Sequence, residues 1–477
     1  MKDLTELTIT QLHEGFKNKQ FTSVEVTRAY LDTIKKTDDK ICAYLAVTEK
    51  LALAQAEKAD KIIAAGGDFP MLCGVPCSIK DSILVEGEQA TSASKMLENY
   101  IAPYDATVIT RLKEQGAVIL GKTNTDEFTM GVSTENSAFK VTKNPHDLER
   151  VAGGSSGGPA ASVAALQACF SLGSDTGGSI RLPASFCGIV GLNPTYGAVS
   201  RHGAIAMASS LDQIGPMTKN VEDTKIVFEA ISGRDAMDAT SAEYKFQDSG
   251  IKIKGLRIGV PQEYFAEGID PEVEKIIRGV IDLAEKNGAH VVPLSLPTTD
   301  YAIACYYIIV PSEISANLAR YDGIKYGFSD NSGKDLLDVY LKSRGAGFGP
   351  EPKRRILLGT YALSSGYYDA YYKKAQEVRE LIRQDFAQAF EKVDVIFSPV
   401  SPIPAFKIGE KKDDPLAMYL MDVYTCPLKL AGIPALSMPV GKIGALPVGL
   451  QIIGNYFEEN KILECAAELE TILKAKK

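Results

Sequence analysis

The 477-residue sequence predicts an α/β fold built around a central sheet. From about residue 70, short apolar runs alternate with amphipathic stretches, which is the pattern of strands followed by helices. The composition, 45% hydrophobic and 23% charged, is typical of a globular protein with a large core. Because no repeat, low-complexity tract or linker divides the chain, we expect residues 1–477 to form a single domain.

The first predicted elements are helices in residues 1–65, where apolar residues recur at three-to-four spacing. Gly66 and Gly67 then end the last of these helices. The predicted strands are residues 74–79, 116–121, 168–174, 256–260, 290–294 and 393–397. The predicted helices between them are residues 105–115, 159–167 and 271–288. Residues 235–255 are the most polar connection, and we expect them to run over the surface.

Charge and cysteine usage exclude several classes of function. A net charge of −8 argues against direct binding of nucleic acid, so any role with nucleic acid would require a partner that binds it. Of the eight cysteines only Cys73 and Cys77 are close, and no second pair or histidine completes a zinc site, so we expect reduced thiols and no metal.

The chain also has no segment that predicts export or a membrane. Its first sixteen residues are polar and amphipathic, unlike a signal or transit peptide, and no run of 18 or more apolar residues follows. We therefore expect a cytoplasmic protein, with an organelle matrix as the alternative.

Residues 116–123, GAVILGKT, match the phosphate-loop pattern of nucleotide-binding proteins. In a true phosphate loop the glycine-rich turn follows the strand, whereas here the middle residues AVIL form the strand itself. We expect a buried strand ending in a turn, with nucleotide binding through Lys122 as the weaker alternative.

Three serines in glycine-rich loops carry the strongest chemical signal. Ser155 and Ser156 lie in GGSSGG (153–158), directly before an apolar helix whose N-terminus favours negative charge. In SDTGGSIR (174–181), residues 175–178 precede Ser179 with a run of amides that suits an oxyanion hole. Arg181 is expected to pair with Asp175 and hold this second loop.

A serine needs a base to become a nucleophile, and the four histidines do not supply one. His202, which follows the loops, has no neighbouring carboxylate and is expected to pack at the surface. Lys80 ends the apolar strand GVPCSIK, and burial there would favour its neutral, basic form. The residues thus indicate a Ser/Lys enzyme, with an anion site at a helix N-terminus as the competing interpretation.

Together Lys80, GGSSGG and GSDTGGSIRLPASFCGIVGL (173–192) resemble the amidase signature family. The resemblance implies a large mixed central sheet covered by helices on both faces, and a Ser–cis-Ser–Lys triad. It makes Ser179 the nucleophile, Ser155 the bridging serine after a cis peptide bond, and Lys80 the base, with Ser156 orienting the network. The oxyanion hole it implies consists of Thr176, Gly177, Gly178 and Ser179.

Other stretches are similar to the glutaminase components of tRNA-dependent amidotransferases: residues 126–139, 144–158, 193–224, 312–327, 353–376 and 447–470. This resemblance implies a glutaminase that releases ammonia for Glu-tRNA(Gln), or for Asp-tRNA(Asn). It places Tyr306, Arg355 and Asp422 around free glutamine. Two alternatives stay open: Arg354 could be the arginine that binds, and Tyr306 or Tyr307 could be an aromatic residue of the core.

The same resemblance implies a heterotrimer in which this chain joins the B and C subunits of the amidotransferase. The B component would use ATP and Mg²⁺ and would hold the tRNA, so this chain would need no cofactor. Three positions depart from the family pattern: Val132, Pro159 and Lys429. A stand-alone amidase of the same family acting on other amides, and a catalytically dead scaffold protein, remain the alternatives.

Overall fold

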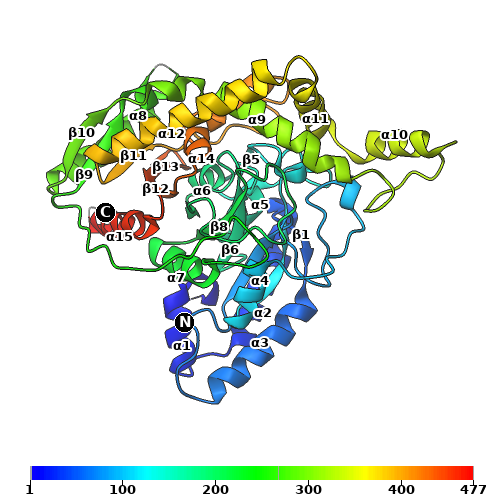
Figure 1. Ribbon diagram of the computed structural model, residues 1–477. Coiled ribbons are helices and arrows are strands. Elements are labelled where there is room, and N and C mark those ends of the chain that lie inside the picture. Colours follow the sequence, from blue (N-terminus) through cyan, green and yellow to red (C-terminus); the bar gives the residue numbers. More distant parts are fainter. Residues whose placement is uncertain (1–2, 267, 476–477) are drawn as a thin grey trace.

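The computed structural model describes residues 3–266 and 268–475, so the first two residues of the predicted helical segment lie outside it. Within this range a large sheet runs through the centre of the molecule and helices surround it (Figure 1). In order across the sheet, its described strands are β1 (Tyr44–Val47), β3 (Val118–Thr123), β2 (Pro76–Lys80), β6 (Phe170–Asp175), β8 (Gln213–Thr218), β7 (Val190–Asn193), β12 (Ala435–Ile443), β13 (Leu446–Ile453), β11 (Val395–Pro399), β9 (Arg257–Pro261) and β10 (His290–Leu294). A separate ribbon pairs β4 (Lys143–Asn144) with β5 (Asp147–Val151).

The sheet is mixed, as the family resemblance implies. Strand β2 is parallel to both of its neighbours, β3 and β6, and β9 is parallel to β10 and β11. The other neighbouring pairs are antiparallel. Because β2 and β6 run in the same direction, Lys80 at the end of β2 and the 176–180 loop after β6 meet at the same edge of the sheet.

Helices cover both faces of the sheet, which confirms the predicted layers. Along β11, Val395 and Phe397 pack into one hydrophobic cluster and the intervening Ile396 packs into another. The first cluster includes residues of α8 and α15, and the second includes residues of α9 and α12. The described helices are α1 (Ile9–Lys17), α2 (Ser23–Ile41), α3 (Glu49–Ala64), α4 (Thr107–Glu114), α5 (Gly157–Ala164), α6 (Arg181–Cys187), α7 (Val221–Ile231), α8 (Pro271–Lys286), α9 (Ala302–Asn317), α10 (Leu336–Gly347), α11 (Pro350–Leu363), α12 (Lys374–Lys392), α13 (Pro415–Tyr419), α14 (Cys426–Ala431) and α15 (Glu459–Ala475).

The prediction for residues 1–65 is correct except at one point. Helices α1, α2 and α3 form, and Gly66 and Gly67 follow α3 with positive φ, as expected. Between α2 and α3, however, β1 adds an edge strand antiparallel to β3. Cys42 turns the chain there with φ 59°, and Asp38 accepts hydrogen bonds from the two N–H groups of Ala43 and Tyr44, at 2.7 and 3.3 Å.

Helix α9 lies within a stretch, Pro297–Arg320, that is long and apolar enough to cross a membrane by length and composition. Half of that apolar window is buried, and α9 packs against α11 and α12. These contacts are typical of a core helix.

The predicted surface connection is also observed. Residues 239–250 form neither helix nor strand, and most of their side chains are at least partly exposed. Tyr244 and Phe246 anchor this segment, since their rings lie 5.1 and 5.3 Å from the ring of Phe228.

Candidate active site

Lys80 lies where the sequence predicts it, at the buried end of β2. Its amine donates hydrogen bonds to the hydroxyls of Ser155 and Ser156, each at 2.8 Å, and to the carbonyl oxygen of Ser174 at 3.2 Å. The side chain is fully buried, and burial lowers the pKa of Lys80 to about 7. Near neutral pH a large fraction of this amine is therefore unprotonated and can accept a proton.

The GGSSGG loop follows β5 and leads into α5. The peptide bond between Gly154 and Ser155 is cis, as the resemblance implies. A side chain at Gly154 would come within 2.5 Å of the backbone nitrogen of Ser133, so only glycine fits there. The Ser156 hydroxyl donates to the carbonyl oxygen of Ser174 at 3.0 Å and accepts from its N–H at 3.3 Å, which fixes this loop against β6.

The second serine loop, residues 176–180, connects β6 to α6. Asp175 folds it back, because its carboxylate accepts hydrogen bonds from the N–H of Ile180 at 3.1 Å and from Arg181 Nε at 3.0 Å. The N–H of Ser156 donates to the carbonyl oxygen of Ser179 at 3.1 Å and so joins the two serine loops. Among the described residues no hydrogen bond links the hydroxyls of Ser155 and Ser179.

The amides of residues 176–179 are free to bind an anion, since none of them donates to an acceptor in the described part of the chain. Both glycines of this loop contact residues that the family resemblance places around the substrate. A side chain at Gly177 would come within 2.5 Å of the Tyr306 hydroxyl, and one at Gly178 within 3.0 Å of Asp422 Oδ1. The structure thus brings Tyr306 and Asp422 to the loop that carries Ser179.

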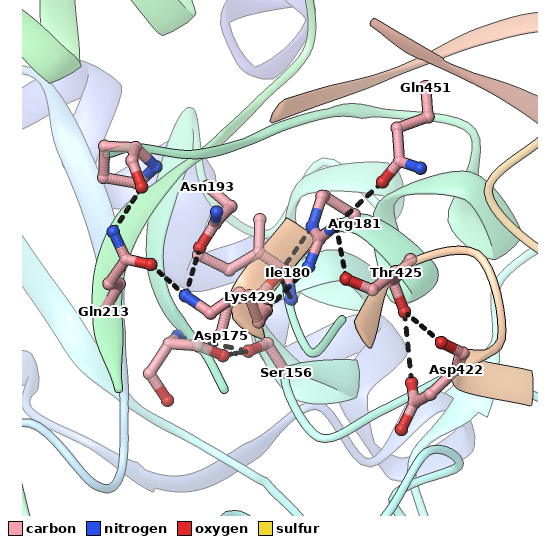
Figure 2. A network of polar contacts seen from close by, with 12 residues as sticks. Ser156, Asp175, Ile180, Arg181, Asn193, Gln213, Asp422, Thr425, Lys429 and Gln451 are labelled. Carbon is pink, nitrogen blue, oxygen red and sulfur yellow. Dashed lines mark hydrogen bonds and ion pairs between the residues drawn. The ribbon is translucent and has the colours of Figure 1, made fainter. Parts of the chain in front are cut away.

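A buried network of charges lies behind this loop (Figure 2). Arg181 pairs with Asp175, as predicted, and also donates to the carbonyl oxygen of Thr425 at 3.2 Å and to Gln451 Oε1 at 2.8 Å. Burial acts to raise the pKa of Asp175, but Arg181, Lys429 and the N–H of Ile180 together outweigh it and hold that pKa below its ordinary value. The ion pair therefore fixes the start of α6 against α14.

Two of the three departures from the family pattern are readily placed. Pro159 is the third residue of α5, where a backbone N–H would have no partner inside the helix. Lys429 is buried and donates to Asn193 Oδ1 at 2.8 Å and to Gln213 Oε1, on β7 and β8 (Figure 2). Burial lowers the pKa of Lys429 to about 7. Lys429 contacts the strands behind the second serine loop.

Arg355 is buried on α11, whereas the side chain of its neighbour Arg354 is 44% exposed. A cavity of about 260 Å³ lies beside them, and Val132, the third departure, is part of its wall. The cavity is lined by Gly131, Val132, Glu135, Asn136, Val141, Tyr307, Glu351, Arg354, Arg355, Ile408, Gly409, Lys412, Pro415, Met418 and Tyr419.

Asp422 is buried in the turn before α14 and is not among the residues that line this cavity. Burial, together with the nearby carboxylate of Asp175, raises the pKa of Asp422 to about 7. The hydroxyl of Thr425 lies 3.4 Å from its Oδ1. A cation placed against Asp422 would favour its ionised form.

The phosphate-loop match is a buried strand, as expected. Residues 118–123 form β3, and Lys122 Nζ lies 3.4 Å from Asp81 Oδ1, with both side chains buried. His202 packs away from the serines, with its ring 5.2 Å from that of Tyr104. Neither residue belongs to the site.

Sequence analysis missed one carboxylate beside Lys80. Asp126 is buried, accepts hydrogen bonds from the N–H groups of Thr134 and Asn136 at 2.9 and 3.1 Å, and burial raises its pKa to about 6. Its charge opposes the effect of burial on Lys80. The sequence signal for it is weak, an acidic residue three positions after the end of β3, the strand that lies beside β2.

The family model named Amidase matches residues 25–463 of this chain. The chain belongs to the amidase family. Among its relatives, the A subunit of glutamyl-tRNA(Gln) amidotransferase from Caldanaerobacter subterraneus subsp. tengcongensis is 56% identical over 476 residues, or 99% of this amidase and 97% of that protein. The protein of the same name from Clostridium botulinum strain Langeland is 54% identical over 98% of this chain and 97% of its own length.

A crystal structure of the protein of that name from Thermotoga maritima is also similar. It is 42% identical to this amidase, the match covers 99% of this chain and 96% of that one, and the TM-score is 0.82. The likeness therefore extends over the whole fold as well as the serine loops.

Proposed function

We propose that this amidase is the glutamine-hydrolysing component of a tRNA-dependent amidotransferase. It would supply ammonia to convert Glu-tRNA(Gln) to Gln-tRNA(Gln), or Asp-tRNA(Asn) to Asn-tRNA(Asn). The observation that carries the proposal is the 56% identity to a glutamyl-tRNA(Gln) amidotransferase chain over nearly the full length of both proteins. The contacts of Lys80 with the serine loop, described above, support the hydrolytic chemistry.

In the proposed reaction, neutral Lys80 accepts a proton from Ser155, and Ser155 takes one from Ser179. The Ser179 oxygen attacks the carboxamide carbon of glutamine, and the amides of residues 176–179 stabilise the negative charge that develops on the carboxamide oxygen. The proton then passes to the departing nitrogen, which leaves as ammonia. Water cleaves the glutamyl ester and restores Ser179.

Arg355 and Asp422 are the groups that we propose recognise free glutamine. A guanidinium pairs with the α-carboxylate and a carboxylate with the α-ammonium. Tyr306 would contact the substrate beside Gly177. A stand-alone amidase acting on a simple apolar amide would have no use for two opposite charges at these positions.

Replacing Asp422 by asparagine is expected to raise KM for glutamine roughly 10- to 100-fold, because a charge-assisted hydrogen bond to the ammonium is lost. Glutaramic acid, which is glutamine without its α-amino group, should be hydrolysed equally well by the variant and the parent protein. Steady-state kinetics with both amides test this. An equal loss on both would show that Asp422 serves the fold and not the ammonium.

The proposed complex also contains the B and C subunits, with ATP and Mg²⁺ used by the B component and the tRNA held through the complex in the cytoplasm. Exposed leucines support a partner. Leu336, Leu337 and Leu341 gather on α10, Leu357 lies on α11, and these side chains are 58–71% exposed. Helix α10 projects from the body of the molecule (Figure 1). A protein partner would shield these leucines from water.

Co-expression with candidate B and C subunits tests the proposal. A complex of three different chains is expected to convert Glu-tRNA(Gln) to Gln-tRNA(Gln) with glutamine as nitrogen donor and ATP present. Rapid turnover of aryl or peptide amides by the chain alone, without turnover of glutamine, would instead identify a stand-alone amidase.

A further inference from the structure

We infer that Glu351 is a positioning residue for substrate recognition, because it holds one edge of the Arg355 guanidinium and leaves the other edge open to the substrate carboxylate. This inference rests on the proposed function. It concerns a residue that has no evident signal in the sequence, since Glu351 lies in an ordinary charged helix start, PEPKRR.

The Arg355 guanidinium is held from one side only. Glu351, one turn earlier on α11, accepts a hydrogen bond from Arg355 Nε at 2.7 Å. Neither terminal nitrogen of Arg355 has a hydrogen-bond acceptor among the residues that the structure describes. Because Arg355 lines the cavity, this unpaired edge can bind a carboxylate through two parallel N–H···O bonds.

Charge around the cavity also favours one anion. Its lining includes two acidic residues, Glu135 and Glu351, and three basic ones, Arg354, Arg355 and Lys412, which leaves one net positive charge. Arg354 pairs with the second oxygen of Glu351, so this one carboxylate faces two arginines. The single negative charge of Glu351 balances one of these two arginines. A net positive charge therefore remains at the cavity to attract a substrate carboxylate.

Glu351 also fixes a wall of the cavity. It accepts a hydrogen bond from the hydroxyl of Tyr419 at 3.1 Å, and the Tyr419 ring stacks on that of Tyr307 with centroids 3.9 Å apart. The Arg355 guanidinium carbon lies 5.3 Å from the centroid of Tyr307 and 5.6 Å from that of Tyr419. Two aromatic rings and one carboxylate therefore restrict the orientation of this arginine.

The same contacts connect the two charged ends of the proposed substrate site. Tyr419 ends α13, three residues before Asp422. Tyr307 follows Tyr306 on α9, and the Tyr306 hydroxyl lies against Gly177 of the second serine loop. Glu351 acts at the carboxylate end of this series, through its contacts with Arg354, Arg355 and Tyr419.

Glu351 is suited to this role because it stays ionised. Burial acts to raise its pKa, but Arg355 and Arg354 outweigh burial and keep the pKa of Glu351 below its ordinary value. The carboxylate therefore holds Arg355 throughout the neutral pH range, with or without a substrate.

The test compares the full-length chain with Glu351→Gln, using glutamine and 4-aminobutanamide, which is glutamine without its α-carboxylate. Glu351→Gln is expected to raise KM for glutamine roughly 10- to 100-fold with kcat changed less than about threefold. KM for 4-aminobutanamide should not change. Equal losses on both substrates, or an unchanged KM for glutamine, would overturn the inference.

A matched control is Glu377→Gln, which makes the same chemical change in an exposed ion pair with Lys374 on α12. It should leave both substrates unaffected. Rescue by Glu351→Asp to a KM between those of the parent and Glu351→Gln would indicate that charge, and not only side-chain shape, holds Arg355.

A binding measurement separates this inference from the proposed function. Glutamate carries the same α-carboxylate and α-ammonium but no reactive amide, so calorimetric titration with it does not depend on hydrolysis. We expect glutamate to bind Glu351→Gln roughly tenfold more weakly than the parent. If the parent chain hydrolyses no glutamine either alone or with the B and C subunits, the proposed function fails. Equal glutamate binding by parent and variant would overturn the role of Glu351.

Discussion

Replacing Ser179 by alanine is expected to lower kcat for glutamine hydrolysis by roughly 10⁴-fold or more, because removal of a serine nucleophile leaves only binding and oxyanion stabilisation. The fold should survive, since the Ser179 hydroxyl makes no hydrogen bond among the described residues and the loop is held by its backbone and by Asp175. Ammonia release in the assembled complex, together with thermal unfolding, measures both effects.

Ser295→Ala is the matched control, because it removes a hydroxyl from an exposed serine directly after β10, on another part of the chain from α10. It should leave kcat unchanged. Rapid acid quenching during turnover, followed by peptide mass spectrometry, should locate a glutamyl ester on Ser179 of the parent protein. A Ser179→Ala protein that keeps more than a tenth of the parent kcat would exclude Ser179 as the nucleophile.

The parts of the site that could be predicted are those with a local signal. Two glycine-flanked serine loops and a lysine at the end of an apolar strand are visible in short stretches of sequence. The parallel pairing of β2 with β6 then brings these stretches together. The difference in burial between Arg354 and Arg355 needed the structure, since adjacent residues on a helix differ in burial only through tertiary packing.

The missed parts depend on residues far apart in the chain. The role of Glu351 depends on its hydrogen bond with Tyr419, and the role of Asp126 depends on its proximity to Lys80.

Within the central sheet, β7, β8, β12 and β13 were missed because glycine and proline interrupt their apolar runs. Gly215 on β8 shows the reason, since a side chain there would collide with the carbonyl oxygen of Leu192 on β7.

Activity should depend steeply on pH because two groups with a pKa of about 7 must each lose a proton. Lys80 accepts a proton only in its neutral form, and Asp422 holds an ammonium only as a carboxylate. Below pH 7, kcat/KM for glutamine is therefore expected to fall by up to about 100-fold per pH unit, one factor of ten for each group. With glutaramic acid, or in Asp422→Asn, only the Lys80 factor should remain.

Lys80→Met is expected to lower kcat by roughly 10³-fold or more and, at the same time, to raise the melting temperature. Burial moves the pKa of Lys80 from 10.5 to about 7, so keeping this amine neutral costs on the order of 5 kcal/mol at pH 7. Between pH 7 and 10.5 the unfolded chain holds a proton on Lys80 that the folded protein lacks. The stability of the parent protein therefore rises with pH relative to the variant, and the difference in melting temperature should shrink from pH 7 to pH 10. A difference that stays constant over this range would show that Lys80 keeps an ordinary pKa, and the proposed base would then be protonated at neutral pH.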